Sequence, residues 1–324
     1  MSQRIIFTGK SLVHDHLIDD YKNKQAPQVL LLSGVTGILK KEFADYLARI
    51  LLCTSDTELK PCGQCISCAQ SQKNQHPNLL YLKAQDGSRS IKIEQMRNLL
   101  SSLSLNPLES GRRVIVIINI ETMTVQAQNA LLKSLEEPHK SDYYILTSSN
   151  ERLVLPTIVS RCRLIRLLPW RREQVHELLI LNKITDSRAA ELSRLSHGKS
   201  GHALGLEDDQ KYWKAKELAE NSFFKIKNIS DIPNASLALK DSKDIADLLL
   251  NFLEQEAQIV LQQRYLDNQD IYQSPWSDAP DKAIKKVLES IFEARKYKTS
   301  NVAWQSIADQ LLFSITKEIY QCQW

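Results

Sequence analysis

The segment from Gln28 to Lys41 constrains the fold more than any other part of the chain. Its first part, QVLLLSG (28–34), is a short apolar run closed by glycine, which is typical of a buried parallel strand. The following KKEFADYLARILL (40–52) has apolar side chains at helical spacing, at positions 43, 46, 47, 50 and 51. A strand, a glycine loop and a helix in this order direct backbone N–H groups toward a bound anion.

The same alternation continues along the first half of the chain. Apolar segments predict strands at 112–118, 141–149 and 163–167. Between the first two, a helix is predicted that begins after Thr124 as N-cap and ends before Pro138. Strands alternating with helices predict an α/β fold, with a parallel sheet covered by helices on both faces.

The pattern changes after Pro169. Residues 172–183 and 187–196 are predicted helices, residues 197–206 carry turn residues, and the chain is helical throughout from about Asp209. Three apolar stripes in this last region are typical of helix packing: Ile245, Leu248, Leu249, Phe252 and Leu253; Ile284, Val287, Leu288 and Ile291; Ile307, Leu311, Leu312 and Ile315. We therefore expect an α/β domain over 1–167, a small helical domain over 168–208 and an all-helical domain over 209–324.

The loop GVTGILKK (34–41) nearly matches the phosphate-binding pattern G-x-x-x-x-G-K-[ST]. Gly34, Gly37 and Lys40 are present, and Lys40 could still meet a phosphate as a point charge. Leu39 replaces the second required glycine and puts a branched side chain where the backbone must pass close to phosphate. Lys41 replaces the hydroxyl that would bind magnesium. The loop is therefore degenerate, and nucleotide is not expected as a regular cofactor.

Four of the six cysteines form a C-x8-C-x2-C-x2-C cluster: Cys53, Cys62, Cys65 and Cys68. Tetrahedral zinc takes four thiolates at such short spacings, so the cluster predicts a structural zinc site. His76 is a spare candidate ligand, although the His76-Pro77 pair also suits a turn that enters the next strand. Four thiolates leave no open position for catalysis, and we expect the metal to hold together an insertion that lacks its own core.

Location and charge are less informative. The N-terminus lacks a signal peptide, and no apolar run approaches the ~18 residues that a membrane span needs, so a cytoplasmic protein is expected. A net charge of +4 permits contact with nucleic acid without requiring it. The scattered basic residues suit either sequence-independent phosphate contacts or an ordinary solvated surface: Lys10, Lys22, Lys24, Arg97, Arg112 and Arg113.

Three features together resemble a known family. NALLKSLEEP (129–138), LPTIVSRC (155–162) and the cysteine cluster before His76-Pro77 look like the bacterial clamp-loader subunits of the AAA+ superfamily, and most closely the delta-prime subunits of DNA polymerase III. This resemblance implies a RecA-like AAA+ domain with a zinc-binding insertion (53–68), a small helical lid domain and a C-terminal helical collar domain.

The resemblance also assigns roles to positions of the nucleotide site. The loop 34–41 takes the place of the Walker A motif, and Ile118 and Asn119 take the places of the Walker B Asp-Glu pair. Gly201 takes the place of a sensor arginine, with His202 beside it as an exposed helix residue. Groups that bind magnesium, activate water and sense the γ-phosphate are thus replaced, and the resemblance implies a site that does not hydrolyse ATP.

Arg161, in the Ser160-Arg161-Cys162 triplet, is implied to be an arginine finger that reaches the ATP site of a neighbouring subunit. The alternative is a structural arginine that pairs with Glu136 or Glu137. The implied partners are clamp-loader ATPase subunits and a delta subunit in a hetero-pentamer, the sliding clamp and primer–template DNA.

Two other functions remain open from the sequence. The chain could be an active AAA+ ATPase motor of the same loader that uses Lys40 with an unusual magnesium shell. It could also be a zinc-dependent nucleic-acid-binding module without loader partners. ATP turnover by the isolated chain would favour the first, and metal-dependent DNA binding by the isolated chain would favour the second.

Overall fold

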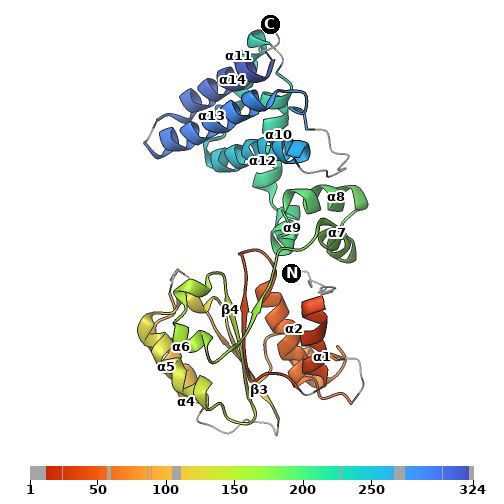
Figure 1. The fold of residues 1–324 in the computed structure, drawn as a ribbon, viewed down its shortest axis with the longest axis vertical. Coiled ribbons are helices and arrows are strands. Elements are labelled where there is room, and N and C mark those ends of the chain that lie inside the picture. The colour runs from red at the N-terminus through yellow and green to blue at the C-terminus, as the bar shows by residue number, and fades with distance from the viewer. Residues whose placement is uncertain are drawn as a thin grey trace. The chain divides into compact units, whose positions relative to one another are not determined.

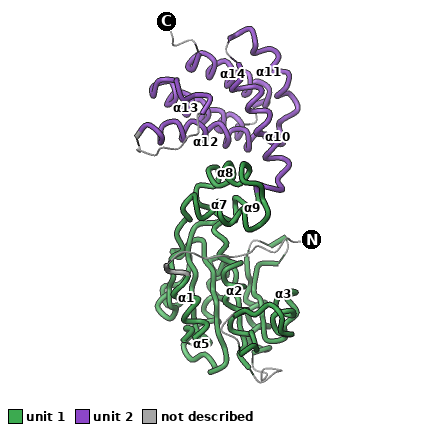
Figure 2. Tube along the Cα trace, turned by 90° about the vertical axis from the view of Figure 1, so that its right-hand side faces the viewer, with its two compact units in different colours: residues 1–205 green, residues 206–324 purple. Residues whose placement is uncertain are grey.

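The computed structural model describes residues 12–23, 25–56, 60–85, 87–88, 90–103, 111–226, 228–265, 274–300 and 302–320. Two compact units make up the chain, residues 1–205 and residues 206–324 (Figure 2). Among the described residues, every helix is too short or too polar to cross a membrane. The division into three domains at 167 and 208 stays a prediction.

The first unit is built on a five-stranded sheet with the strand order β2-β3-β4-β1-β5, and every strand pairs in parallel with its neighbours. The strands are β1 (Val29–Ser33), β2 (Leu79–Leu82), β3 (Arg113–Ile117), β4 (Asp142–Ser148) and β5 (Arg163–Arg166). The sequence predicted β1, β3, β4 and β5 to within two residues at each end. Buried on both faces, the central strands are apolar except at their ends, as is typical of a parallel sheet.

Helices cover both faces of this sheet (Figure 1). One face packs α1 (Leu12–Lys22) and α2 (Lys40–Leu52) against Leu30 and Leu32, and the other packs α4 (Ile93–Leu103), α5 (Val125–Glu136) and α6 (Pro156–Val159) against Leu31. Neighbouring residues of β1 therefore belong to opposite cores, because side chains alternate along a strand. The α/β fold predicted from the sequence is confirmed.

Helix α5 shows how closely local chemistry sets the boundaries. The Thr124 side chain accepts a hydrogen bond from the backbone N–H of Ala127, which satisfies one of the free donors at the helix start. The helix ends at Glu136, two residues before Pro138. Both ends agree with the prediction, and Glu136 is thereby placed at the helix terminus that faces Arg161.

The rest of the first unit is helical. It comprises α3 (Ile66–Gln72) in the cysteine-rich insertion, and α7 (Arg172–Leu181), α8 (Asp186–Leu195) and α9 (Ser200–Glu207) after the sheet. The predicted turn over 197–206 is wrong beyond Lys199. Only His197 and Gly198 have positive φ, and the chain is helical from Ser200. Gly201 and Gly205 weaken this helix without forbidding it.

The second unit consists of helices only, as predicted. They are α10 (Gln210–Ala219), α11 (Ile232–Leu239), α12 (Ala246–Tyr265), α13 (Asp281–Thr299) and α14 (Trp304–Tyr320), with short helical turns at 220–224, 229–231 and 243–245. The three apolar stripes are core, with only Leu248 and Leu288 partly exposed. The indole N–H of Trp304, at the start of α14, donates to Ser242 Oγ (2.9 Å) and to the Leu239 carbonyl (3.2 Å) at the end of α11. Trp304 therefore links α14 to α11.

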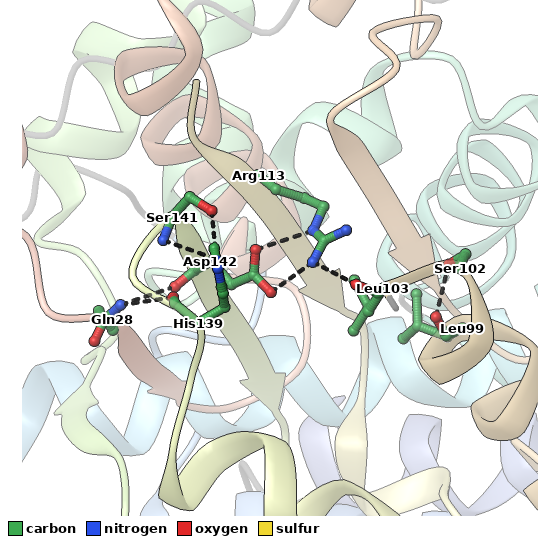
Figure 3. A network of polar contacts seen from close by, with 8 residues as sticks. All are labelled: Gln28, Leu99, Ser102, Leu103, Arg113, His139, Ser141 and Asp142. Carbon is green, nitrogen blue, oxygen red and sulfur yellow. Dashed lines mark hydrogen bonds and ion pairs between the residues drawn. The ribbon is translucent and has the colours of Figure 1, made fainter. Parts of the chain in front are cut away.

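Arg113 is a correction to the sequence-based expectation of a surface residue or a phosphate contact. Its side chain is 7% exposed and donates from Nε (3.0 Å) and Nη2 (2.8 Å) to the two carboxylate oxygens of Asp142 on β4 (Figure 3). Nη2 also donates to the Leu103 carbonyl at the end of α4. Arg113 therefore ties α4 to the start of two strands, and this buried ion pair cannot contact DNA.

Among the candidates that the structure describes, Arg112, Arg97 and Lys22 do not form a phosphate-binding cluster. Arg112 lies over the Tyr143 ring, 5.7 Å from its centroid, and donates to the Leu51 carbonyl. Arg97 is exposed and Lys22 is partly exposed. Lys10 and Lys24 lie outside the described residues.

Candidate functional site

The degenerate phosphate loop lies where β1 ends and α2 begins, at the carboxyl edge of the sheet. Gly34 must be glycine there. A Cβ at this position would lie 2.5 Å from Ile38 Cδ1 and 2.6 Å from the Leu167 carbonyl oxygen. The N–H of Leu167 also donates to the Ser33 carbonyl at 2.7 Å. The start of the loop therefore packs tightly against Leu167, the residue that directly follows β5.

Lys40 is buried and bonds to its own loop. Its Nζ donates to the carbonyl oxygens of Gly34 and Val35, both at 2.8 Å, and the residue is only 7% exposed. Burial lowers the pKa of Lys40, and the nearby carboxylates of Glu121 and Glu42 oppose that shift. A phosphate oxygen would have to compete with two backbone carbonyls for this ammonium group.

Leu39 occupies a backbone conformation that favours glycine. Its φ of 60° and ψ of 33° are left-handed, and its side chain is buried. The backbone at Leu39 thus has the left-handed conformation that suits the glycine of the phosphate-binding pattern. The leucine side chain, however, occupies space beside the loop that a glycine would leave open. Lys41, at the position of the magnesium-binding hydroxyl, forms an exposed ion pair with Asp45 at 3.0 Å.

The first turn of α9 covers this loop. The backbone N–H groups of Gly201 (2.7 Å) and His202 (3.2 Å) both donate to the Gly37 carbonyl. A Cβ on Gly201 would lie 2.9 Å from Leu39 Cδ2 and 3.1 Å from that same carbonyl oxygen. The Leu39 side chain therefore fills the space that a side chain at position 201 would need. Leu39 and Gly201 both depart from the family pattern, and the two departures fit each other. The sequence missed this contact because it predicted a turn there.

We predict an energetic coupling between these two positions. Gly201→Ala should destabilise the protein by about 1 kcal/mol through overpacking, and this cost should shrink by at least ~0.5 kcal/mol in a Leu39→Ala background. Gly205→Ala is the matched control on the same helix, because its Cβ would meet nothing within 4 Å and should stabilise the helix slightly. Denaturant unfolding of the four variants measures the coupling, and additive costs would contradict the packing described here.

The residues that follow β3 hold neither a carboxylate pair nor a ligand set for magnesium. Ile118 packs against the core on the α2 side. Asn119 has a φ of 53°, which asparagine tolerates, and its N–H donates to Thr147 Oγ1 at 2.9 Å. Glu121 Oε1 accepts the Ser149 N–H at 2.9 Å, while Oε2 is buried and no described residue donates to it. The Ser149 N–H thus holds the Glu121 side chain in place.

The four clustered cysteines meet the geometric requirement of a metal site. The Sγ atoms of Cys53, Cys62, Cys65 and Cys68 all lie within 4.8 Å of one another. Four sulfurs bound to one zinc ion at ~2.3 Å would lie roughly 3.8 Å apart, so the set fits with small adjustments. All four come from the end of α2, the insertion and the start of α3, as the spacing predicted.

Backbone N–H groups already stabilise thiolates in this cluster. The N–H of Cys65 donates to Cys62 Sγ and the N–H of Cys68 donates to Cys65 Sγ, both at 3.4 Å. Burial alone would raise the pKa of Cys65, but donors from Cys68 and Thr54 lower it to about 6. The arrangement therefore favours a deprotonated sulfur at Cys65, whereas burial raises the pKa of Cys68 to about 12.

His76 supports the insertion and does not join the cysteines. It is 5% exposed, its Nδ1 accepts the Asn78 N–H at 3.1 Å, and its Nε2 lies 2.7 Å from Ser67 Oγ. Since Nδ1 accepts, Nε2 carries the proton and donates to Ser67, whose hydroxyl donates on to the Leu52 carbonyl at 2.6 Å. This chain ties α3 to the end of α2, and the turn into β2 follows directly, as the alternative interpretation expected.

Arg161 lies between α6 and β5, just before the start of β5, and therefore at the amino edge of the sheet, opposite the edge that holds the phosphate loop. Its Nη1 donates to the Thr157 carbonyl at 2.7 Å, and its Nη2 pairs with the carboxylate of Glu136. The side chain is 32% exposed, so part of the guanidinium remains accessible. The pairing with Glu136 matches the structural alternative, and a role in a neighbour's site stays a prediction.

Parallel strands in the order 2-3-4-1-5, a glycine loop leading into α2 and helices after the sheet define an α/β protein of the RecA-like, AAA+ class. A sequence model of the family described as "DNA polymerase III, delta subunit" matches residues 9–171. The chain belongs to this DNA polymerase III delta subunit family.

The chain is also similar in sequence to individual delta′ subunits of DNA polymerase III. Subunit delta′ of DNA polymerase III from Pseudomonas aeruginosa is 36% identical over 138 residues (43% of this chain, 42% of the relative), and that from Escherichia coli K12 is 30% identical over 205 residues (63% and 61%). These alignments span less than two thirds of those relatives. Subunit delta′ from Bacillus subtilis is 25% identical, over 92% of this chain and 94% of the relative. A gamma subunit-related protein of Thermotoga maritima superposes with a TM-score of 0.49 at 19% identity, over 93% of this chain and 99% of that chain.

Proposed function

We propose that this chain is a non-hydrolysing subunit of the clamp loader of DNA polymerase III. It would assemble with ATPase subunits and a delta subunit into a hetero-pentamer and help to load the sliding clamp onto primer–template DNA. It would supply Arg161 in trans to the ATP site of a neighbouring subunit. Family membership and the match to delta′ relatives support this assignment.

One observation above all supports the inactivity of the chain's own site. Lys40 donates to Gly34 and Val35 instead of pointing to an open phosphate position, and α9 donates to Gly37 from the other side. Catalysis of phosphoryl transfer depends on positioned charges around phosphate and magnesium. With Ile118 and Asn119 at the end of β3, where the family pattern would supply carboxylates, this chain offers few of those charges.

We further propose that the four cysteines hold one structural zinc ion, that the protein works in the cytoplasm and that any DNA contact is sequence-independent. Four thiolates would leave no open coordination position, so the ion would hold the 53–68 insertion against α2. The second unit would be the collar through which the subunits associate, and residues 168–208 would form the small lid domain.

An active ATPase is the alternative function. The chain is also 30% identical over 208 residues to subunit gamma of Buchnera aphidicola and 31% identical over 184 residues to subunit tau of Salmonella typhimurium. These similarities favour common ancestry with subunits gamma and tau of DNA polymerase III. The closed loop around Lys40 favours the non-hydrolysing role.

Reconstitution tests the proposal. The chain is mixed with the ATPase subunits, delta, the clamp and primed circular DNA, and clamp retention on the DNA is measured after gel filtration. We expect loading only when this chain is present. Efficient loading by the other subunits without it would contradict the proposed function.

A further inference from the structure

We infer that Glu136 is a positioning residue that holds the Arg161 guanidinium ready for an acceptor supplied by another subunit. This inference rests on the proposed function of Arg161 and adds a second residue to it. The two residues are 25 positions apart in sequence and come from different elements, so the fold brings them together. Glu136 is the last residue of α5, and Arg161 follows α6.

The contacts that hold Arg161 in place use only some of the N–H donors of its guanidinium. An arginine has five N–H donors in a planar fork. Here Nη2 pairs with Glu136 and Nη1 donates to the Thr157 carbonyl, the only partners of this side chain among the described residues. Three N–H groups therefore remain for a phosphate oxygen without breaking either contact.

The surroundings favour retention of the cation in this place. The C-terminal end of a helix carries a partial negative charge, which attracts a guanidinium. The Glu136 side chain is 49% exposed and that of Arg161 is 32% exposed, so water screens the pair and it adds little to folding stability. Its main effect is to reduce the freedom of a long side chain before a partner arrives. Ordering that side chain in advance removes a cost from the step in which it meets the triphosphate.

The neighbouring glutamate provides a matched control. Glu137 is also exposed, carries the same charge and has no contact with Arg161 among the described residues. Glu136→Ala and Glu137→Ala therefore make the same change in net charge one residue apart. Glu136→Gln keeps an acceptor oxygen but removes the charge, so it should restore part of the function.

The test measures ATP turnover of the reconstituted loader with clamp and primed DNA. We expect Glu136→Ala to lower kcat by about threefold to tenfold, the rate equivalent of ordering one long side chain, with KM unchanged. Glu136→Gln should fall in between and Glu137→Ala should match wild type. In an Arg161→Ala background, Glu136→Ala should have no further effect, because it acts through Arg161.

Failure of this inference is distinct from failure of the proposed function. If Arg161→Ala lowers turnover strongly while Glu136→Ala behaves like Glu137→Ala, Glu136 does not position the arginine and the proposed function stands. If Glu136→Ala keeps its full effect without Arg161, Glu136 acts by another route and the inference is wrong. If Arg161→Ala leaves turnover unchanged, both proposals fail together.

Discussion

Replacing Arg161 with alanine is expected to lower the clamp- and DNA-stimulated ATP turnover of the reconstituted loader by roughly a thousandfold at the neighbouring site. Arginine fingers delivered in trans accelerate GTP hydrolysis by about 10³–10⁵, since a guanidinium spreads its charge over the γ-phosphate oxygens. Arg161 suits this role because it is partly exposed and only two of its donors are engaged. Its removal costs the chain an exposed ion pair with Glu136 and one hydrogen bond to the Thr157 carbonyl, so folding should be preserved.

Two further variants sharpen this prediction. Arg161→Lys keeps the charge but loses the planar fork, and should recover only a small part of the activity. Arg166→Ala is the control, because Arg166 at the end of β5 forms a similar exposed pair with Glu151, in the short helical turn that follows β4, at 2.9 Å. Assembly of all variants is checked by gel filtration. Equal turnover for Arg161→Ala and wild type, with intact assembly, would remove the finger assignment.

Loss of zinc should have the second large effect. In zinc-finger peptides the metal contributes about 10–16 kcal/mol of apparent binding free energy, which is also folding free energy. Here the metal would secure an insertion on a unit that has its own core, so part of the fold should survive. We expect Cys65→Ser to abolish stoichiometric zinc and to lower Tm by about 6–12 °C, which corresponds to ~3 kcal/mol in a unit of this size. Metal analysis and thermal unfolding measure these effects.

Cys65→Ser separates the metal from the local helix. Cys65 is the N-cap of α3, where its sulfur accepts the N–H of Cys68, and serine is a good replacement for that cap. Cys162→Ser is the control outside the cluster, since among the described residues its thiol donates to the Ile158 carbonyl and is not part of the cysteine cluster. Cys162→Ser should keep the zinc and the wild-type Tm. Wild-type protein that contains no zinc after purification with zinc present would refute the site.

Sequence patterns predicted the elements with strong local signals. Apolar runs gave the central strands, and Thr124 and Pro138 gave the limits of α5, because these boundaries depend on residues within one or two turns. Cysteine spacing gave the cluster for the same reason. The stripes around Leu249, Val287 and Leu311 marked the helical core of the second unit.

Contacts between segments that are far apart in the chain could not be predicted from local sequence patterns. The order of the strands depends on how α2, α4 and α5 pack, and no local pattern encodes it. The bond from α9 to the Gly37 carbonyl joins two glycine-containing segments that each read as a turn. Arg113 looked like any surface arginine, because its partner Asp142 lies on another strand. The same limit applies to Arg161, for which the sequence left Glu136 and Glu137 as equal candidates.

The most direct test of the account is ATP turnover by the purified chain alone, with magnesium, compared with its Lys40→Ala variant. Lys40 is held by the Gly34 and Val35 carbonyls, and Ile118 and Asn119 after β3 are not magnesium ligands of the Walker B kind. The account predicts that both proteins show the same background rate. Turnover by the wild-type chain that disappears in Lys40→Ala would contradict it.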